Sequence, residues 1–265
     1  MNDNQDEHKP SVDPNHDPEE PTEMGYVIGL FDVLGFEMLH RQHGTKKVTE
    51  IYQELIDKVI VKTADELWSF TAIRWDDRLV PAMGTLPVRY AYFSDTILLW
   101  VPLVEHFIEP FAVRCSDMII EGLSIGIPLR GSISVGGAVM NKRKSVFLGE
   151  PLIEAARLEK AQNWIGVSYG QTATNPKFQD ALRYNFVIQF YTKHYKPNSE
   201  NLISQMVLDW PRRMRDKHDP NIILDKIKEL RSKTDKTIYY DNTLAFIEHS
   251  EQNQDWFKTE MKNEM

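Results

Sequence analysis

Two short apolar runs in this chain each end in an aspartate. Residues 26–31 are followed by Asp32, and residues 90–93 by Ser94, Asp95 and Thr96. Apolar runs of this length, bounded by turn-forming residues, predict buried strands. A carboxylate at the end of a buried strand is costly to desolvate unless positive charge lies beside it. If the two strands are neighbours in one sheet, both carboxylates lie at the same edge, where they could hold two divalent cations and a nucleotide triphosphate.

Each aspartate also has a simpler explanation. Asp32 leads into a predicted helix that opens at Gly35, so it could merely cap that helix. Asp95 lies in a predicted hairpin turn, where aspartate is common because of turn geometry alone. The helix start, however, also offers free backbone N–H groups, which form an anion site next to Asp32. Together these features predict that metal and phosphate would be held side by side.

Composition excludes several other classes of protein. The chain has 265 residues and a formal net charge of −8, but residues 1–23 hold eight acidic residues and one lysine, which leaves −1 for the rest. No global basic field therefore favours nucleic acid as a partner. Cys115 is the only cysteine, so an intrachain disulfide and a cysteine zinc cluster are excluded. No apolar run has the roughly 20 residues of a membrane helix, and no secretory signal is recognised, so we expect a soluble, cytoplasmic protein.

The order of predicted elements indicates an α+β fold. The predicted order is β-α-β-β-α-β followed by β-α-β, a ferredoxin-like βαββαβ core with helices on one face of a mainly antiparallel sheet. The predicted strands are residues 25–31, 88–93, 97–101, 129–140, 145–148 and 164–168, and the predicted helices are residues 35–64, 105–122 and 151–162. Residues 65–86 have no clear pattern.

Three regions follow from this pattern. Residues 1–23 are polar and acidic, and we expect them to be disordered. Residues 24–172 form the predicted catalytic domain. Residues 173–265 are expected to pack on that domain or to serve a dimer, with strand-like segments at 186–191 and before 211 and helices at 222–230 and 244–261.

A third candidate component is Arg157, in the predicted helix 151–162. An arginine here could hold a polyphosphate bidentately in the transition state. Arg157 also lies three residues after Glu154 on one helical face, so an ordinary surface ion pair is the alternative. Arg130-Gly131 and Gly136-Gly137 would allow close backbone approach, or mark a bulge. The sequence holds no Gly-x-Ser-x-Gly, Walker or Gly-x-Gly-x-x-Gly motif, and no histidine spacing typical of zinc.

Residues 25–170 resemble the catalytic domain of class III nucleotidyl cyclases. The resemblance rests on Phe31-Asp32-Val33-Leu34-Gly35-Phe36, on Ser94-Asp95, on Arg130 to Gly136, and on Gly149 to Leu158, in the order of the family's motifs. It implies that Asp32 and Asp95 hold two divalent cations, Mn²⁺ or Mg²⁺, with the Val33 carbonyl as a further ligand. It also implies that the backbone of Leu34, Gly35 and Phe36 faces the phosphates and that Arg157 stabilises the transition state. In this family the sites form between two chains, so a homodimer is implied.

The departures from the family pattern concern the base. The family's transition-state asparagine is replaced by Ile153, its purine-reading lysine by Ala91, and its purine-reading aspartate by Val146. Arg89 and Tyr92 flank Ala91 and could read a pyrimidine instead. Strand alternation places Arg89 on the Asp95 face and Tyr92 on the other, which favours Arg89.

This combination resembles the bacterial pyrimidine cyclases of the Pycsar antiphage systems. That resemblance implies conversion of UTP to cyclic UMP, a second messenger that acts on a separate effector. Three alternatives stay open: a cytidylate cyclase, a purine cyclase with an altered base pocket, and an inactive cyclase-like module that binds a nucleotide.

Overall fold

The structure is a computed structural model that describes residues 21–61, 69–75, 78–84, 88–174, 187–190, 194–197, 199 and 206–254. Almost all of the acidic segment 1–23, and the end of the helix predicted for 244–261, lie outside these residues. A separate two-stranded sheet pairs β2 (Ser69–Trp75) with β3 (Arg78–Gly84), in the stretch where the sequence has no clear pattern.

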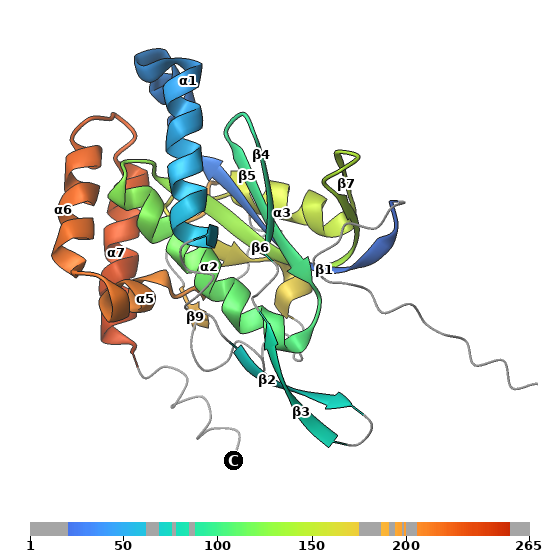
Figure 1. The fold of residues 1–265 in the computed structure, drawn as a ribbon. Helices are drawn as coiled ribbons and strands as arrows, with labels where there is room; N and C mark the ends of the chain where they lie inside the picture. The colour runs from blue at the N-terminus through green and yellow to red at the C-terminus, as the bar shows by residue number, and fades with distance from the viewer. Residues whose placement is uncertain are drawn as a thin grey trace, which may run out of the picture.

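The large sheet is built around β1 (Glu23–Val33), which pairs antiparallel on both sides (Figure 1). The strand order is β4-β5-β1-β6-β8-β10-β9, with β7 paired to β6, and β6–β8 is the parallel pair among these neighbours. The bounds are β4 (Arg89–Phe93), β5 (Thr96–Pro102), β6 (Leu129–Asn141), β7 (Val146–Leu148), β8 (Val167–Tyr169), β9 (Val187–Gln189) and β10 (Met206–Leu208). The segment β4-β5-β1-β6 has the order of a ferredoxin-like core, so the predicted fold class is confirmed.

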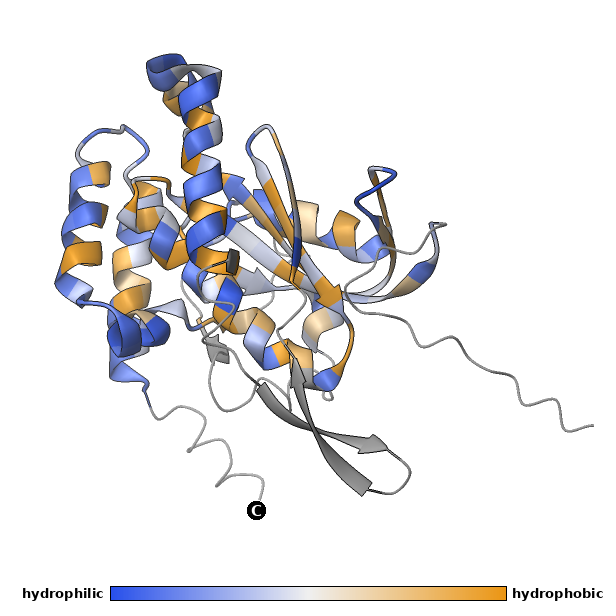
Figure 2. Ribbon diagram, in the orientation of Figure 1, coloured by the Kyte–Doolittle hydropathy of each residue, from blue (hydrophilic) through white to orange (hydrophobic). Residues whose placement is uncertain are grey.

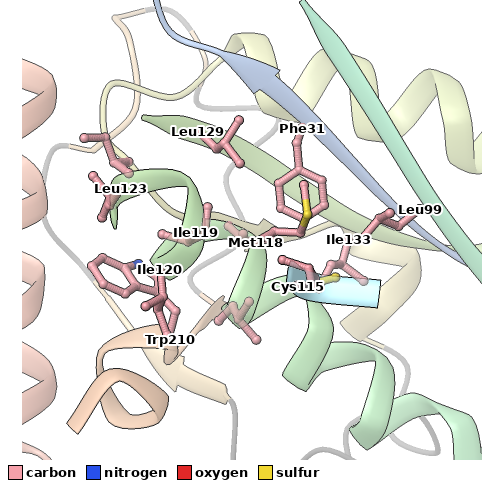
Figure 3. Close-up of a cluster of buried hydrophobic side chains, with 14 of the residues drawn as sticks. Phe31, Leu99, Cys115, Met118, Ile119, Ile120, Leu123, Leu129, Ile133 and Trp210 are labelled. Atoms are coloured by element: carbon pink, nitrogen blue, oxygen red, sulfur yellow. The ribbon is translucent and has the colours of Figure 1, made fainter. Parts of the chain in front are cut away.

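The helices lie on both faces of this sheet, so the prediction that they share one face is wrong. α2 (Glu105–Ser124) covers the face that carries Phe31, Leu99 and Ile133, and it contributes Cys115 and Met118 to one buried core (Figure 3). α3 (Glu150–Lys160) packs on the opposite face, against a second buried cluster. Both faces of β1 are therefore apolar, because alternate residues of the strand serve different cores.

The helix predicted for 35–64 is not one straight helix. α1 (Phe36–Ile56) contains Gly44 at φ 72° and ψ 165°, and it continues as a π-helix over Asp57–Val61. The rings of Phe36 and Tyr52 lie 6.3 Å apart, although sixteen helical residues would span about 24 Å. The chain therefore folds back at Gly44 and forms two helical segments side by side.

The C-terminal region packs on α2. It forms α5 (Trp210–Lys217), α6 (Pro220–Arg231) and α7 (Ile238–Gln252), after the short 3₁₀ helix Gln171–Thr174. Trp210 is fully buried in the same core as α2. Arg213 donates from Nε and Nη2 to the two carboxylate oxygens of Asp117 in α2, at 2.8 and 3.1 Å. Residues 210–211, which the sequence assigned to the end of a strand, begin α5 instead, with Pro211 in its first turn.

Candidate active site

Asp32 and Asp95 meet at one edge of the sheet. Asp32 pairs in register with Thr96 across β1 and β5, and the N–H of Val33 donates a 2.9 Å hydrogen bond to the carbonyl oxygen of Asp95. Two aspartates that are distant in the sequence are thus fixed side by side by backbone pairing. Both are half-buried, and both line the same groove.

The backbone between β1 and α1 forms the floor of this groove. Gly35 has a left-handed conformation with φ 79°, which favours glycine, and no side chain caps the helix that follows. The Leu34 N–H already donates to the Pro128 carbonyl at 2.9 Å. The first-turn N–H groups after Gly35 have no partner within the helix, so they present partial positive charge next to Asp32.

The groove has a volume of about 1310 Å³ and lies between the first half of α1, the α2–β6 connection and the C-terminal helices. In Figure 2, α6 and the outer part of α1, which border it, are mostly hydrophilic. Its charged lining comprises cations from three parts of the chain together with several carboxylates. The cations are Arg41, Lys47, Arg130, Lys196, Lys226, Lys233 and Lys236. A polyanion bridged by divalent cations matches this mixture of charges.

Arg130 joins Asp32 to a second carboxylate. Its Nη2 donates to Asp32 Oδ2 at 3.0 Å and its Nε donates to Glu159 at 2.5 Å, while Nη1 donates to the carbonyl of Gln162 at 3.0 Å. Burial raises the pKa of Asp32, with Arg130 opposing and Asp95 reinforcing the rise. Burial also raises the pKa of Glu159 to about 7, although Arg130 again acts in the opposite direction.

Tyr52 contacts the hairpin that carries Asp95. Its hydroxyl donates to the carbonyl of Ser94 at 3.1 Å, which ties the second segment of α1 to the hairpin that carries Asp95. Burial raises the pKa of Tyr52, and the negative charges of Asp95 and Asp32 raise it further. Both carboxylates therefore act electrostatically on the same phenol.

The other sequence-predicted residues lie away from the groove. Among the described residues that line it, Arg89, Tyr92 and Arg157 are absent. Arg157 is exposed on α3, and Glu154 bonds Thr172. Tyr92 packs edge-on against Tyr52 at 5.6 Å.

The two base-reading candidates also separate by face. Ala91 packs against the second buried cluster, which α3 covers, and Arg89 lies two residues away on the same strand, so it alternates onto the same face. Tyr92 instead packs against Tyr52 of α1. Asp32 also alternates onto the α3 side of β1, so Arg89 shares its face. The alternation of Ala91 and Tyr92 agrees with the expected separation of Arg89 from Tyr92, and the placement of Arg89 on the face of Asp95 stays a prediction.

Arg130, Glu159 and Lys196 were missed as site residues. For Arg130 a signal existed: an arginine in an otherwise apolar strand needs a buried partner, and its register position opposite Asp32 supplies one. Glu159 and Lys196 carried no such signal, because their places depend on how α3 and the C-terminal region pack.

The donor set at the site suits divalent cations that arrive with a phosphate. Asp32 and Asp95 supply hard oxygen ligands, and the backbone carbonyl of Val33, the residue after Asp32, could supply another. The part of the chain that the structure describes holds no cluster of three or more His, Cys, Asp or Glu side chains that could cage a metal ion. Mg²⁺ bound with nucleotides takes one or two carboxylates and completes its shell with phosphate oxygens and water, so a pair of aspartates fits this role.

Searches against protein-family models and against curated proteins find no match. Solved structures with a similar fold include the guanylyl cyclase Cya2, at 11% identity and TM-score 0.40 over 71% of this chain and 91% of that one. A bacterial light-regulated adenylyl cyclase matches at 12% identity and TM-score 0.47, over 80% of this chain and 57% of that one. A class III adenylyl cyclase-like ATP-binding protein from Pseudomonas aeruginosa matches at 9% identity and TM-score 0.38, over 88% of this chain and 44% of that one.

At these identities and TM-scores the likenesses assign no substrate and no activity. This chain also spans only about half the length of the last two proteins. None of the helices in the described part of the chain combines the length and the apolar character needed to cross a bilayer.

Proposed function

We propose that this chain is a divalent-cation-dependent nucleotidyl cyclase that converts UTP to 3′,5′-cyclic UMP and pyrophosphate. One observation carries the proposal: Asp32 and Asp95 lie side by side, fixed by the Val33–Asp95 hydrogen bond, at a groove with many cationic side chains. Carboxylates, free helix N–H groups and cations in one groove are the components that a metal-bound triphosphate requires.

The residues have distinct roles in this proposal. Asp32, Asp95 and the Val33 carbonyl would hold Mn²⁺ or Mg²⁺, and the backbone of Leu34, Gly35 and Phe36 would receive phosphate oxygens. Bound divalent cations would lower the pKa of the ribose 3′-hydroxyl and neutralise charge on the triphosphate. The 3′ oxygen forms a bond to the α-phosphorus as the bond to the pyrophosphate oxygen breaks, and the hydroxyl proton passes to solvent. Both products then leave the groove.

Arg157 would act from a second copy of the chain. It is exposed on α3, away from the aspartates of its own chain, so it can stabilise charge at the α-phosphate only in a homodimer with shared sites. Exposed Ile153 and Leu148, at 44% and 65% relative exposure, lie on or just before the same helix and give such a dimer an apolar contact.

Base selection is assigned to Arg89, with Tyr92 as the weaker candidate. Arg89 does not line the groove, but strand alternation places it on the same face of the sheet as Asp32. Its guanidinium could donate to the carbonyl of a pyrimidine that extends beyond the groove towards β4. We favour uracil over cytosine, with cytidylate cyclase and an altered purine cyclase as the alternatives. The proposed cyclic UMP would act in the cytoplasm on a separate effector in antiphage defence.

A module that binds a nucleotide without turnover is the second candidate. Two observations favour it: Ile153 stands where the family has its transition-state asparagine, and Arg130 already neutralises one oxygen of Asp32. In such a module the groove would bind a triphosphate and release it unchanged.

Incubation of the purified full chain with each of the four nucleoside triphosphates and Mn²⁺ tests the proposal. We expect cyclic UMP from UTP, and a loss of about 1000-fold in kcat for Asp32→Asn and for Asp95→Asn. Asp225→Asn, on the exposed surface of α6 and outside the groove, is the matched control and should keep full activity. Tight nucleotide binding without any cyclic product would instead establish a module that binds a nucleotide without turnover. A cyclic purine product would overturn the assignment of pyrimidine selection to Arg89.

A further inference from the structure

The C-terminal region supplies one wall of the groove, although the resemblance to cyclases ends near residue 170. Lys196, α6 and the α6–α7 connection bring four lysines to the groove. Two of them, Lys226 and Lys233, both contact Glu229, so one carboxylate is shared between two ammonium groups. Within the described residues, no ion pair joins either of the other two, Lys196 and Lys236, to a carboxylate.

Lys196 is held next to the aspartate site. Its backbone N–H donates to the Ala161 carbonyl at 2.6 Å, and its ammonium donates to the carbonyl of Lys160 at 2.5 Å. Burial lowers the pKa of Lys196, and Arg130 is the next cause, while Glu159 opposes it. The ammonium at the end of α3 therefore lies close to a second cation, Arg130, and shares the field of Glu159 and Asp32 with it.

Lys236 is tied to the same place through Tyr239. The Tyr239 ring lies 5.8 Å from the Arg130 guanidinium, and its hydroxyl accepts a 3.5 Å hydrogen bond from Arg130 Nη1. Lys236 precedes Tyr239 by three residues and lines the groove with an exposed side chain. The positive charge of Lys236 also lowers the pKa of Lys196, so the two ammonium groups are close enough to repel each other.

We propose that Lys196 and Lys236 bind the terminal phosphates of the nucleoside triphosphate, so that the C-terminal region completes the substrate pocket. The inference rests on the proposed function, because it assumes the same groove and the same class of substrate. Asp32, Asp95 and the two lysines line the same groove. In this proposal the α-phosphate lies at the aspartates and the β- and γ-phosphates lie at the lysines. A triphosphate would supply the anions that both ammonium groups lack.

Inorganic tripolyphosphate is the probe, because it has neither a base nor a reactive hydroxyl. Its binding to the full chain is measured by titration calorimetry in the presence of Mg²⁺. We expect Lys196→Gln and Lys236→Gln each to weaken binding about tenfold. Lys228→Gln, on the exposed side of α6 and outside the groove, is the matched control and should bind like the wild type. Circular dichroism verifies that each variant is folded.

The results separate this inference from the proposed function. If the wild type makes cyclic UMP but both variants keep their affinity for tripolyphosphate and their KM for UTP, the inference is overturned and the cyclase assignment stands. If no nucleotide is cyclised but tripolyphosphate binds in a manner that depends on both lysines, the inference stands and the cyclase assignment fails. Tighter binding of a single-stranded oligonucleotide than of tripolyphosphate, lost in the same variants, would also overturn it.

Discussion

Arg130 controls the charge of the site because it is shared between two carboxylates. The side chains of Asp32, Arg130 and Glu159 are 21%, 9% and 3% exposed, so solvent reaches Asp32 from the groove but hardly reaches Glu159. A buried carboxylate needs its partner, whereas an accessible one can be hydrated or can bind a cation. Glu159 therefore acts as the structural anchor of Arg130, and Asp32 stays available to a ligand.

Removing Arg130 tests this difference. Arg130→Met leaves Glu159 buried without a cation, and we expect the free energy of unfolding to fall by about 3 kcal/mol. The double variant Arg130→Met/Glu159→Met removes the stranded charge and should recover at least half of that loss. Urea denaturation followed by circular dichroism measures both. Equal stability of the single and double variants would show that Glu159 is not the group that requires Arg130.

The raised pKa of Glu159 predicts a pH dependence of stability. The pKa is about 7 in the folded chain against 4.5 for the unfolded reference, so the folded protein binds the extra proton between these values. The contribution of Glu159 to the free energy of unfolding should therefore be greatest below about pH 4.5. It should decline by at most about 3 kcal/mol as the pH rises towards 7.

The measurement compares unfolding free energies at pH 5, 6 and 7 for the wild type and Glu159→Gln. Glutamine keeps an oxygen that can accept from Arg130 but cannot ionise, so the variant should have the flatter profile. Asp32, whose pKa is also raised, leaves a residual slope in the same direction. A steeper profile in the variant would contradict the assignment to Glu159.

At the scale of elements, the bend in α1 positions both sides of the site. The segment before Gly44 starts at the phosphate-facing backbone, and the segment after it carries Tyr52 back to the Asp95 hairpin. Only the second segment has residues buried in the core, including Val48 and Leu55. The first segment is therefore held by its connection to β1 and by contacts such as that of Phe36 with Tyr52.

The substitution Gly44→Ala tests whether α1 is bent at Gly44 or continuous. In a continuous helix, alanine in place of glycine would stabilise the protein by about 1 kcal/mol. At φ 72° and ψ 165° an alanine is strained although no atom lies within 4 Å of its Cβ, so we expect a loss of about 1–3 kcal/mol. Lys46→Ala, exposed in the same helix, should change stability by less than about 0.5 kcal/mol. Thermal or urea unfolding shows whether Gly44→Ala raises or lowers the stability of the protein.

The sequence could predict the elements whose pattern is local. Apart from β2 and β3, which the sequence did not predict, the order of strands and helices up to residue 170 is confirmed, because each has its own periodicity and turn residues. The meeting of Asp32 with Asp95 follows from the strand order. The bend at Gly44 was missed because apolar residues continue at helical spacing on both sides of it. The placement of α3 on the second face and of Lys196 in the groove depends on tertiary packing, which no local pattern records.

At the scale of the whole molecule, the groove belongs to both parts of the chain. α2 lies between the sheet and the C-terminal helices, and Trp210 and Asp117 contribute to one continuous interior (Figures 1 and 3). Among the described residues that line the groove, the arginines are Arg130, which is already bound to two carboxylates, and Arg41, which is paired with Glu37. In the proposed function, the exposed Arg157 on α3 would reach the aspartates of a second copy, so the proposal requires a homodimer with shared sites.

Complementation between two inactive variants tests that arrangement. In a symmetric dimer each site takes its aspartates from one chain and Arg157 from the other, so Asp32→Asn and Arg157→Ala should each abolish cyclisation alone. A mixed dimer has one site with both defects and one intact site. After the two variants are unfolded and refolded together in equal amounts, about half of the dimers are mixed, and roughly a quarter of wild-type activity should return. Mixing Asp32→Asn with Asp95→Asn is the matched control, because every site then lacks one aspartate and no activity should return. Full activity of Arg157→Ala alone, or a monomer in sedimentation at the assay concentration, would contradict a shared site.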